Sequence, residues 1–433
     1  MMQPCPRVAI VGAGFGGLQA ACSLANKNVE VVLIDRNNHH TFVPLLYQVA
    51  TAQLAPEQVA VSLRTLLRRG KNLNFLQAEV TQIDLESKKI YTDRNVLHYD
   101  YLILATGSKS NFLGVSGAAQ FTWQLKTLSQ AVQLRNHLLQ CFEQASLIAD
   151  PSLREQLLTI AIVGGGATGV ELAGSLLELI EHSLLKDFPH LNSQAVRLLL
   201  IQKSDRLLPE FSSALGKYTT KKLRKLGVKV LLESQVTAIN KESLELDDGT
   251  QIATATTIWA VGGLGARPDF FAKNNAPASG KIAVTPTLQL ADYPQVFAIG
   301  DLARVPQQAL SGVAPEALQQ GVYVAHTICR RIQGKPIKPF NYFNKGRLAI
   351  IGCYSGIGQI AGIELTGFLP WLFWLAVHLV YFPDWRNRLM ILLTWLHNYL
   401  WRDRAIKLIL DNSLVPMSKQ TVSLAVTQSI NSE

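Results

Sequence analysis

The sequence is short of charged residues and of cysteines, and both shortages narrow the kind of protein that it can encode. Charged residues make up 17% of the 433 positions, against about a quarter in an average globular protein. The five cysteines are scattered, and no two of them stand in a CxxC or CxxxxC spacing. We therefore expect neither a disulfide scaffold nor a metal site, and a reducing compartment fits the chain.

Signals for export and for nucleic-acid binding are absent as well. The N-terminal residues MMQPCPR lead straight into a strand-like run, so no signal peptide or transit segment is visible. The formal net charge of +10 favours contact with an anionic surface. No nucleic-acid recognition motif accompanies that charge, so we expect no nucleic-acid partner and favour a membrane surface.

A glycine-rich turn near the N-terminus predicts a dinucleotide-binding fold. It follows the apolar run Val8–Val11, and its glycines, in G-x-G-x-x-G spacing, are Gly12, Gly14 and Gly17. In such a turn the first glycine makes a tight bend, the second lets the backbone approach a pyrophosphate, and the third allows close helix–strand packing. The next strand ends at Asp35, where an acid can accept a hydrogen bond from a ribose hydroxyl.

A second turn of the same kind lies in mid-sequence. It follows the strand-like run Leu158–Val163, and its glycines are Gly164, Gly166 and Gly169. Here the next strand ends not in an acid but in Gln202. A glutamine keeps hydrogen-bonding capacity without repelling a 2′-phosphate, and Lys203 and Arg206 add positive charge nearby. The second turn therefore predicts that NADH binds and that NADPH serves as a second donor.

The order of the apolar strands predicts an α/β protein in which one Rossmann-like domain is inserted into another. A first unit closes on the strand Tyr101–Leu104, and a second closes on a similar strand and turn at 257–263. The strand that begins at Val296 ends in Gly-Asp301 and is expected to return to the first sheet, where its carboxylate can accept from a polyol chain. We place the first domain at 1–112 and 285–363, the second at 113–284, a helical module at 364–411, and a flexible tail at 412–433.

The helical module is apolar and rich in tryptophan. Thr366–Phe382 is interrupted by Pro370 and His378 and is barely long enough to span a bilayer, and Leu389–Trp401 is too short. The flanking cations and aromatic residues are Arg386, Arg388, Arg402, Arg404 and Lys407, with Trp371, Trp374, Trp385, Trp395 and Trp401. Such segments predict amphipathic helices that lie in the headgroup plane of a membrane. A buried interface in a homodimer is the alternative.

With these motifs in view, the sequence resembles the type II NADH:quinone oxidoreductases, which belong to the flavoproteins with two dinucleotide-binding domains. Both glycine motifs, Leu104-Ala-Thr-Gly107 and Ile299-Gly-Asp301 match the wider superfamily. The more specific segments are Asn38–Thr51 (NHHTFVPLLYQVAT), Ala314–Gly321 (APEALQQG) and Phe382–Arg388 (FPDWRNR).

The resemblance implies a role for each matching position. It assigns FAD to Gly12, Gly14, Gly17, Asp35, Ala105, Thr106, Gly107 and Asp301. It assigns the nicotinamide dinucleotide to Gly164, Gly166, Gly169 and Gly262, next to the Gln202 already considered. Glu171 matches a glutamate near the nicotinamide and flavin rings, and Gln319 matches a glutamine at the quinone end of the flavin. One departure is Pro315, which stands where related enzymes often carry another glutamine and which has no side-chain donor.

The implied activity is hydride transfer from NADH to FAD, followed by delivery of two electrons to a membrane quinone without proton pumping, on the cytoplasmic face of a membrane. Two alternatives stay open. A sulfide:quinone oxidoreductase would use distant cysteines, for which Cys141 and Cys353 are the candidates. A redox-sensing flavoprotein would bind both nucleotides but turn over slowly.

Overall fold

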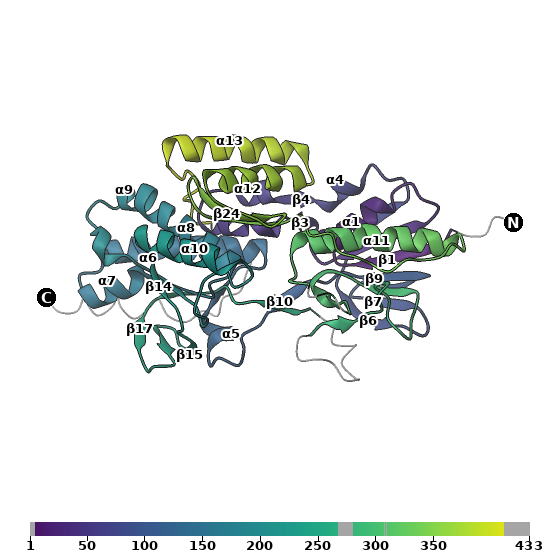
Figure 1. Cartoon of the computed structure of the whole chain (residues 1–433), viewed down its shortest axis with the longest axis horizontal. Helices are drawn as coiled ribbons and strands as arrows, with labels where there is room; N and C mark the ends of the chain where they lie inside the picture. Colours follow the sequence, from purple (N-terminus) through teal and green to yellow (C-terminus); the bar gives the residue numbers. More distant parts are fainter. Residues whose placement is uncertain (1–4, 267–279, 307, 309, 411–433) are drawn as a thin grey trace.

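The computed structural model describes residues 5–266, 280–306, 308 and 310–410, and it contains two five-stranded parallel β-sheets (Figure 1). The first sheet has the order β21-β9-β1-β2-β5. Its strands are β1 (Arg7–Val11), β2 (Glu30–Asp35), β5 (Leu73–Gln77), β9 (Tyr101–Leu104) and β21 (Val296–Ala298). Strands buried on both faces read as continuous apolar runs, which is why the sequence showed them clearly.

The second sheet repeats this arrangement. Its order is β11-β18-β12-β13-β14, again with every pairing parallel. Its strands are β11 (Trp123–Gln124), β12 (Thr159–Val163), β13 (Arg197–Ile201), β14 (Lys229–Leu231) and β18 (Thr256–Trp259). All of them lie in the sequence between β9 and β21, so the chain leaves the first sheet, builds the second and returns.

An antiparallel ribbon joins the two sheets. It pairs β10 (Ser108–Ser110) with β19 (Gly263–Gly265), and it crosses between the two halves of the molecule in Figure 1. Each half also carries a three-stranded antiparallel sheet at the same point in its strand order. These are β6 (Val80–Asp84), β7 (Lys89–Thr92) and β8 (Val96–His98), and β15 (Val236–Ile239), β16 (Ser243–Leu246) and β17 (Gln251–Ala253). Two further pairs are β3 (His39–Thr41) with β4 (Ala60–Ser62) and β20 (Ile282–Ala283) with β22 (Ala303–Arg304).

Each glycine turn leads into a helix that packs on its own sheet. These helices are α1 (Phe15–Ser23) and α8 (Ala167–Leu179). Helix α1 also packs closely on α11 (Ala314–Ile332), because a Cβ on Gly321 would lie only 2.5 Å from the carbonyl oxygen of Gly16. The other helices include α2 (Leu46–Ala50), α3 (Pro56–Val59), α4 (Leu63–Leu67), α5 (Ala118–Phe121), α6 (Leu128–Leu147), α7 (Pro151–Leu158), α9 (Leu185–Asp187) and α10 (Ser213–Lys225).

The C-terminal unit packs directly against the second half of the protein. It consists of a three-stranded sheet and two helices, β23 (Arg347–Gly352), β24 (Ser355–Ile360), β25 (Ile363–Gly367), α12 (Phe368–Tyr381) and α13 (Trp385–Trp401). A Cβ on Gly174 of α8 would lie 2.0 Å from the carbonyl oxygen of Ile351, so α8 rests directly on β23. Trp371, Trp374 and Trp395 are buried in the same hydrophobic core as α8.

The two residues expected to interrupt the first C-terminal helix do not break it. Pro370 lies in the first turn of α12, where its missing N–H has no intrahelical partner to lose. His378 Nδ1 donates to the carbonyl of Trp374, one turn back. Within the described residues, no helix combines the length and the apolar character needed to cross a membrane. The expected tail at 412–433 falls outside the described residues.

Candidate functional site

The first glycine turn has the geometry of a phosphate cradle. Gly12 has a φ of +100°, and a Cβ there would lie 2.4 Å from the carbonyl oxygen of Ala105. A Cβ on Gly17 would lie 1.8 Å from the carbonyl oxygen of Gly12. Gly14, by contrast, has nothing within 4 Å of its Cβ position and caps the N-terminus of α1. The outer glycines therefore close the fold, and the middle one leaves room for a pyrophosphate beside the positive end of the helix.

The second turn reproduces this geometry position by position. Gly164 has a φ of +110°, and its Cβ would lie 2.9 Å from the carbonyl oxygen of Ala260. A Cβ on Gly169 would lie 1.9 Å from the carbonyl oxygen of Gly164, while Gly166 has open space and caps α8. One chain thus contains two glycine turns of the same geometry, and each has an open middle position.

The residues at the ends of β2 and β13 bind the two turns in the same way. Asp35 Oδ2 accepts from the backbone N–H of Ala13 at 2.7 Å. Gln202 Oε1 accepts from the backbone N–H of Gly165, also at 2.7 Å, and its Nε2 donates to the hydroxyl of Ser204. The side-chain amide of Gln202 therefore accepts the same backbone hydrogen bond as the carboxylate of Asp35. The second turn lacks only the negative charge.

The remaining residues assigned to FAD gather at the same edge of the first sheet. Ala105 follows β9, and the hydroxyl of Thr106 donates to the carbonyl of Ala266 at 2.7 Å. Gly107 has a φ of +72° and open space at its Cβ position. Asp301 follows β21, next to β9, and accepts from the hydroxyl of Ser108 at 2.7 Å. In the second half Gly262 follows β18 and also has open space at its Cβ position.

Two buried polar residues at the start of α11 were missed as functional candidates by the sequence reasoning. Glu316 accepts from the backbone N–H groups of Ser311, Gly312 and Val313, and so holds the loop before the helix. Gln320 Oε1 accepts from the backbone N–H of Gly300 at 2.6 Å, beside Asp301. Both lie in the quoted segment APEALQQG, and an acid three residues after a helix N-cap is the signal that could have found Glu316.

Glu171 lies two residues after the last glycine of the second turn and faces the C-terminal unit. Its Oε1 accepts from the indole Nε1 of Trp374 at 2.9 Å and from the backbone N–H of Ile350 at 3.4 Å. Burial raises the pKa of the Glu171 carboxyl to about 8 and outweighs these two hydrogen bonds, which lower it. The group therefore holds a proton at neutral pH, and Oε2 is the oxygen left to carry it.

Gln319 lines a large cavity but is already engaged by the backbone. Its Nε2 donates to the carbonyl of Phe343 at 2.9 Å, and its Oε1 accepts from the N–H of Phe343 at 3.0 Å. The cavity has a volume of about 890 Å³ and lies between α1, α11, the end of α12 and the loop 338–345. Pro315 lines it too, whereas Glu171 is not among the residues of its wall.

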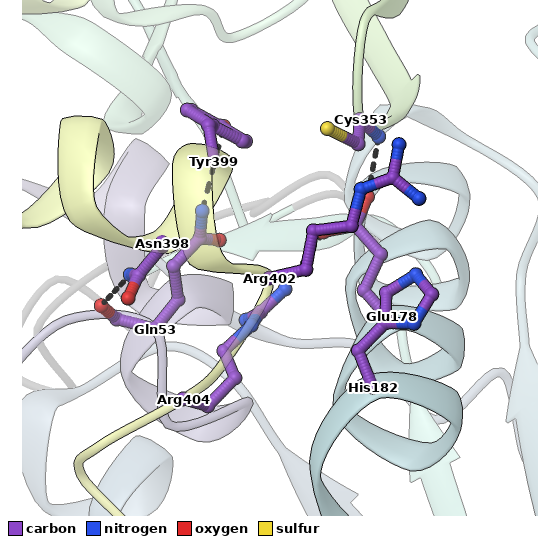
Figure 2. Close-up of a pocket in the computed structure, with 8 residues that line it drawn as sticks. All are labelled: Gln53, Glu178, His182, Cys353, Asn398, Tyr399, Arg402 and Arg404. Atoms are coloured by element: carbon purple, nitrogen blue, oxygen red, sulfur yellow. Dashed lines mark hydrogen bonds and ion pairs between the residues drawn. The ribbon is translucent and has the colours of Figure 1, made fainter.

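A buried arginine connects the C-terminal segment to both halves of the protein. Arg404 forms an ion pair of 2.8 Å with Glu178 of α8 and donates to the carbonyl of Thr51, which follows α2. Figure 2 shows Arg404 at one wall of a small pocket, with Glu178 on the neighbouring helix and Cys353 above it. Lys407 is likewise paired, with Asp187 at 2.6 Å. The expectation that Arg404 faces a membrane is therefore wrong, because Glu178 of α8 neutralises it inside the protein.

Neither candidate cysteine has the properties of a reactive thiol. Cys141 is buried on α6 next to His137 and Thr256, and burial raises its pKa to about 11. Cys353 follows β23, and burial next to Glu178 raises its pKa to about 12. A nucleophilic cysteine needs a lowered pKa. Both thiols are free and protonated at neutral pH.

Comparison with known proteins identifies the family. The model of the pyridine nucleotide-disulphide oxidoreductase family matches residues 6–321. A type II NADH:quinone oxidoreductase from Mycobacterium tuberculosis is 36% identical over 91% of this chain and 88% of its own length. The chain belongs to the type II NADH:quinone oxidoreductases.

The fold of this family member is shared with solved structures. NDH2 from Plasmodium falciparum, solved in complex with NADH, aligns with a TM-score of 0.85 at 21% identity, over 94% of this chain and all of that one. A sulfide:quinone oxidoreductase from Aquifex aeolicus aligns with a TM-score of 0.70 at 19% identity, over 88% and 91% of the two chains. At these identities the likeness concerns the fold alone.

The raised pKa of Glu171 predicts a distinct dependence of stability on pH. The folded protein keeps this proton up to pH of about 8, whereas the unfolded chain releases it near the ordinary value of 4.5. The folded state thus binds more protons between these limits, and the wild type should lose stability relative to Glu171→Gln as the pH rises from 5 to 8. Thermal unfolding of both proteins from pH 5 to 9 measures this difference. Glu242→Gln, on an exposed turn, is the control, and a difference in Tm that did not change with pH would contradict the assignment.

Proposed function

We propose that this enzyme oxidises NADH, keeps FAD as its resident electron carrier, and reduces a membrane quinone. The observation that carries the proposal is the presence of two equivalent glycine cradles in one chain, one tied by a carboxylate and the other by an amide. Two dinucleotides can then bind at once, and the C-terminal unit lies against the helix of the second cradle. The family assignment supports the same pairing of donor and acceptor.

The residues of the first cradle fit FAD. The first domain, 1–112 and 285–363, would hold it through Gly12, Gly14, Gly17, Asp35, Ala105, Thr106, Gly107 and Asp301. The second domain, 113–284, would hold the nicotinamide dinucleotide through Gly164, Gly166, Gly169, Gln202 and Gly262. Bound FAD supplies the chemistry of accepting a hydride and delivering two electrons. The open space at Gly14 and Gly166 is what a pyrophosphate requires in each site.

Glu171 and Gln319 contribute in different ways. Glu171 holds a proton on Oε2 because Oε1 is occupied by Trp374 and Ile350. Glu171 does not line the proposed quinone cavity, so its proton would reach a quinone there only through an intervening group. Gln319 fixes the loop around Phe343 against α11 and so shapes the wall of the cavity of about 890 Å³. This cavity is the proposed quinone site, since its size and its mixture of apolar and polar side chains suit such a ligand.

The membrane contact is proposed for the outer faces of α12 and α13. Their inner faces bury Trp374 and Trp395, so the anchor is part of the folded body and not a separable module. The exposed apolar side chains are Phe368, Leu369, Leu372, Phe373, Val377, Val380, Leu389, Met390, Leu392, Leu393, Leu396, Leu400 and Trp401. With exposed Arg386, Arg388 and Arg402 nearby, this surface suits a protein that lies on the cytoplasmic face of a membrane.

Steady-state turnover tests the proposal directly. The purified protein should contain FAD that is released by heat and identified by chromatography, and it should oxidise NADH with a quinone as acceptor. A protein that carried FMN, or none after reconstitution, would contradict the cofactor assignment. Binding of both nucleotides with negligible turnover would indicate a redox sensor. Sulfide-dependent flavin reduction that is lost in Cys353→Ser would instead favour a sulfide:quinone oxidoreductase.

Gln202 should set the choice between NADH and NADPH. We expect the wild type to oxidise NADPH at a rate comparable to that with NADH, because no negative charge opposes the 2′-phosphate. Gln202→Glu keeps the length of the side chain and its tie to Gly165 but adds that charge, so it should lower kcat/KM for NADPH about 10-fold or more relative to NADH. Gln194→Glu adds the same charge at an exposed site in the same domain. An unchanged ratio in Gln202→Glu would count against this role.

The outer face of α13 should govern membrane binding. Leu393, Leu396 and Leu400 have apolar side chains that are 52–62% exposed. Replacing each by glutamine should weaken the free energy of membrane binding by about 1 kcal/mol, because less apolar surface is buried in the lipid. Binding to lipid vesicles in a co-sedimentation assay should fall about 100-fold, while NADH:ferricyanide activity stays intact. The control exchanges Leu113, Leu147 and Leu153, which are exposed elsewhere, for glutamine. Unchanged vesicle binding, with a shift from dimer to monomer, would assign this face to a homodimer.

A further inference from the structure

Gln319 and Pro315, in the wall of the proposed quinone cavity, have few hydrogen-bond donors that are free to reach a ligand. The carbonyl oxygens of a quinone only accept hydrogen bonds, so the site must supply N–H or O–H groups. Pro315 has no such group, and the carboxamide of Gln319 is bound to Phe343 at both ends. Pro315 and Gln319, the positions that the resemblance places at the quinone, therefore offer its carbonyl oxygen few free hydrogen-bond donors.

His40 and Tyr323, two other polar side chains in the wall, are also engaged. His40 Nδ1 bonds to the carbonyl of Ala13 at 2.9 Å, and because a carbonyl only accepts, the proton lies on Nδ1 and leaves Nε2 as an acceptor. Burial also lowers the pKa of His40, so the ring stays neutral. Tyr323 lies one turn further along α11 than Gln319, and its hydroxyl donates to the carbonyl of Lys338.

Lys345 and Tyr381 form a donor pair in the wall of the same cavity as Gln319. Lys345 follows Phe343 by two residues, and Phe343 is the residue that Gln319 binds. The ammonium of Lys345 donates to the Tyr381 hydroxyl oxygen at 3.0 Å, which leaves the Tyr381 O–H free to donate in turn. The Lys345 Nζ also lies 5.7 Å from the centre of the tyrosine ring.

The charge of Lys345 is not neutralised by an acidic side chain in the part of the chain that the structure describes. No ion pair among the described residues includes Lys345, and the wall of the cavity contains no aspartate or glutamate. The wall of the cavity therefore carries an exposed ammonium with no acidic partner among the described residues. A cation favours an oxygen on which negative charge develops.

We propose that Tyr381 and Lys345 bind the quinone and determine its orientation in this enzyme. The Tyr381 hydroxyl donates to one quinone carbonyl, and the Lys345 ammonium polarises that hydroxyl and stabilises the charge that develops on the oxygen during reduction. Overall a quinone takes up two electrons and two protons to give a quinol, and the pair itself gains and loses no proton. This assignment rests on the proposed function and provides the donors that Pro315 cannot supply.

The test compares Tyr381→Phe and Lys345→Met with the wild type, all loaded with FAD, using a ubiquinone with one isoprene unit. Tyr381→Phe removes only the hydroxyl, so the Kd for the oxidised quinone, measured by calorimetry, and its KM should rise about 3- to 10-fold. Lys345→Met should lower kcat/KM for the quinone about 10-fold or more. The double variant should lose less than the product of the two effects, because both residues act on one oxygen.

The control is Lys335→Met, which removes an exposed cation that does not line the cavity. It should leave the Kd and KM for the quinone unchanged, and all variants should keep the wild-type rates of flavin reduction by NADH and of ferricyanide reduction. Unchanged Kd and KM in both test variants, or an equal loss in Lys335→Met, would overturn the assignment. A wild type that bound the quinone but did not reduce it would contradict the proposed function instead, and the calorimetry would still decide the role of the pair.

Discussion

A Cβ atom on Gly17 would lie 1.8 Å from the carbonyl oxygen of Gly12, and one on Gly169 would lie 1.9 Å from that of Gly164. In each half the helix can therefore approach the strand only because no side chain intervenes. This close approach aims the N-terminus of the helix at the carboxyl edge of the sheet, where in the first half the polar residues after β9 and β21 gather. The middle glycines, Gly14 and Gly166, are then the open positions at which a phosphate can approach the backbone.

The same kind of contact joins the C-terminal unit to the second half. Gly174 lets α8 rest on β23, and the adjoining face of α8 carries polar residues that bind that unit. Glu171 accepts from Trp374 of α12, and Glu178 binds Arg404 of the C-terminal segment. A buried ion pair contributes little net stability by itself, but it is costly to break once formed. Helix α8 of the second half and helices α12 and α13 therefore share one core.

What the sequence predicted well were features encoded over short distances. The glycine turns, their strands and the strand-end residues Asp35 and Gln202 follow from local spacing and apolar periodicity, and the two sheets confirm the expected α/β fold. The partners of Gln319 and Arg404 could not be foreseen, because Phe343 and Glu178 lie 24 and 226 positions away. Cationic residues beside an apolar helix resemble a membrane anchor whether or not an acid from elsewhere in the chain neutralises them. Only the tertiary structure separates Arg402, which is exposed, from Arg404, which is buried.

The two cradles differ in one charge, and that difference has a physical consequence for how the two nucleotides are used. Asp35 and Gln202 bind their turns at the same distance, so the backbone gains the same support from either. A carboxylate forms stronger hydrogen bonds with a ribose than an amide does. The two glycine turns therefore have the same backbone support and differ in the charge that the strand-end side chain would present to a ribose.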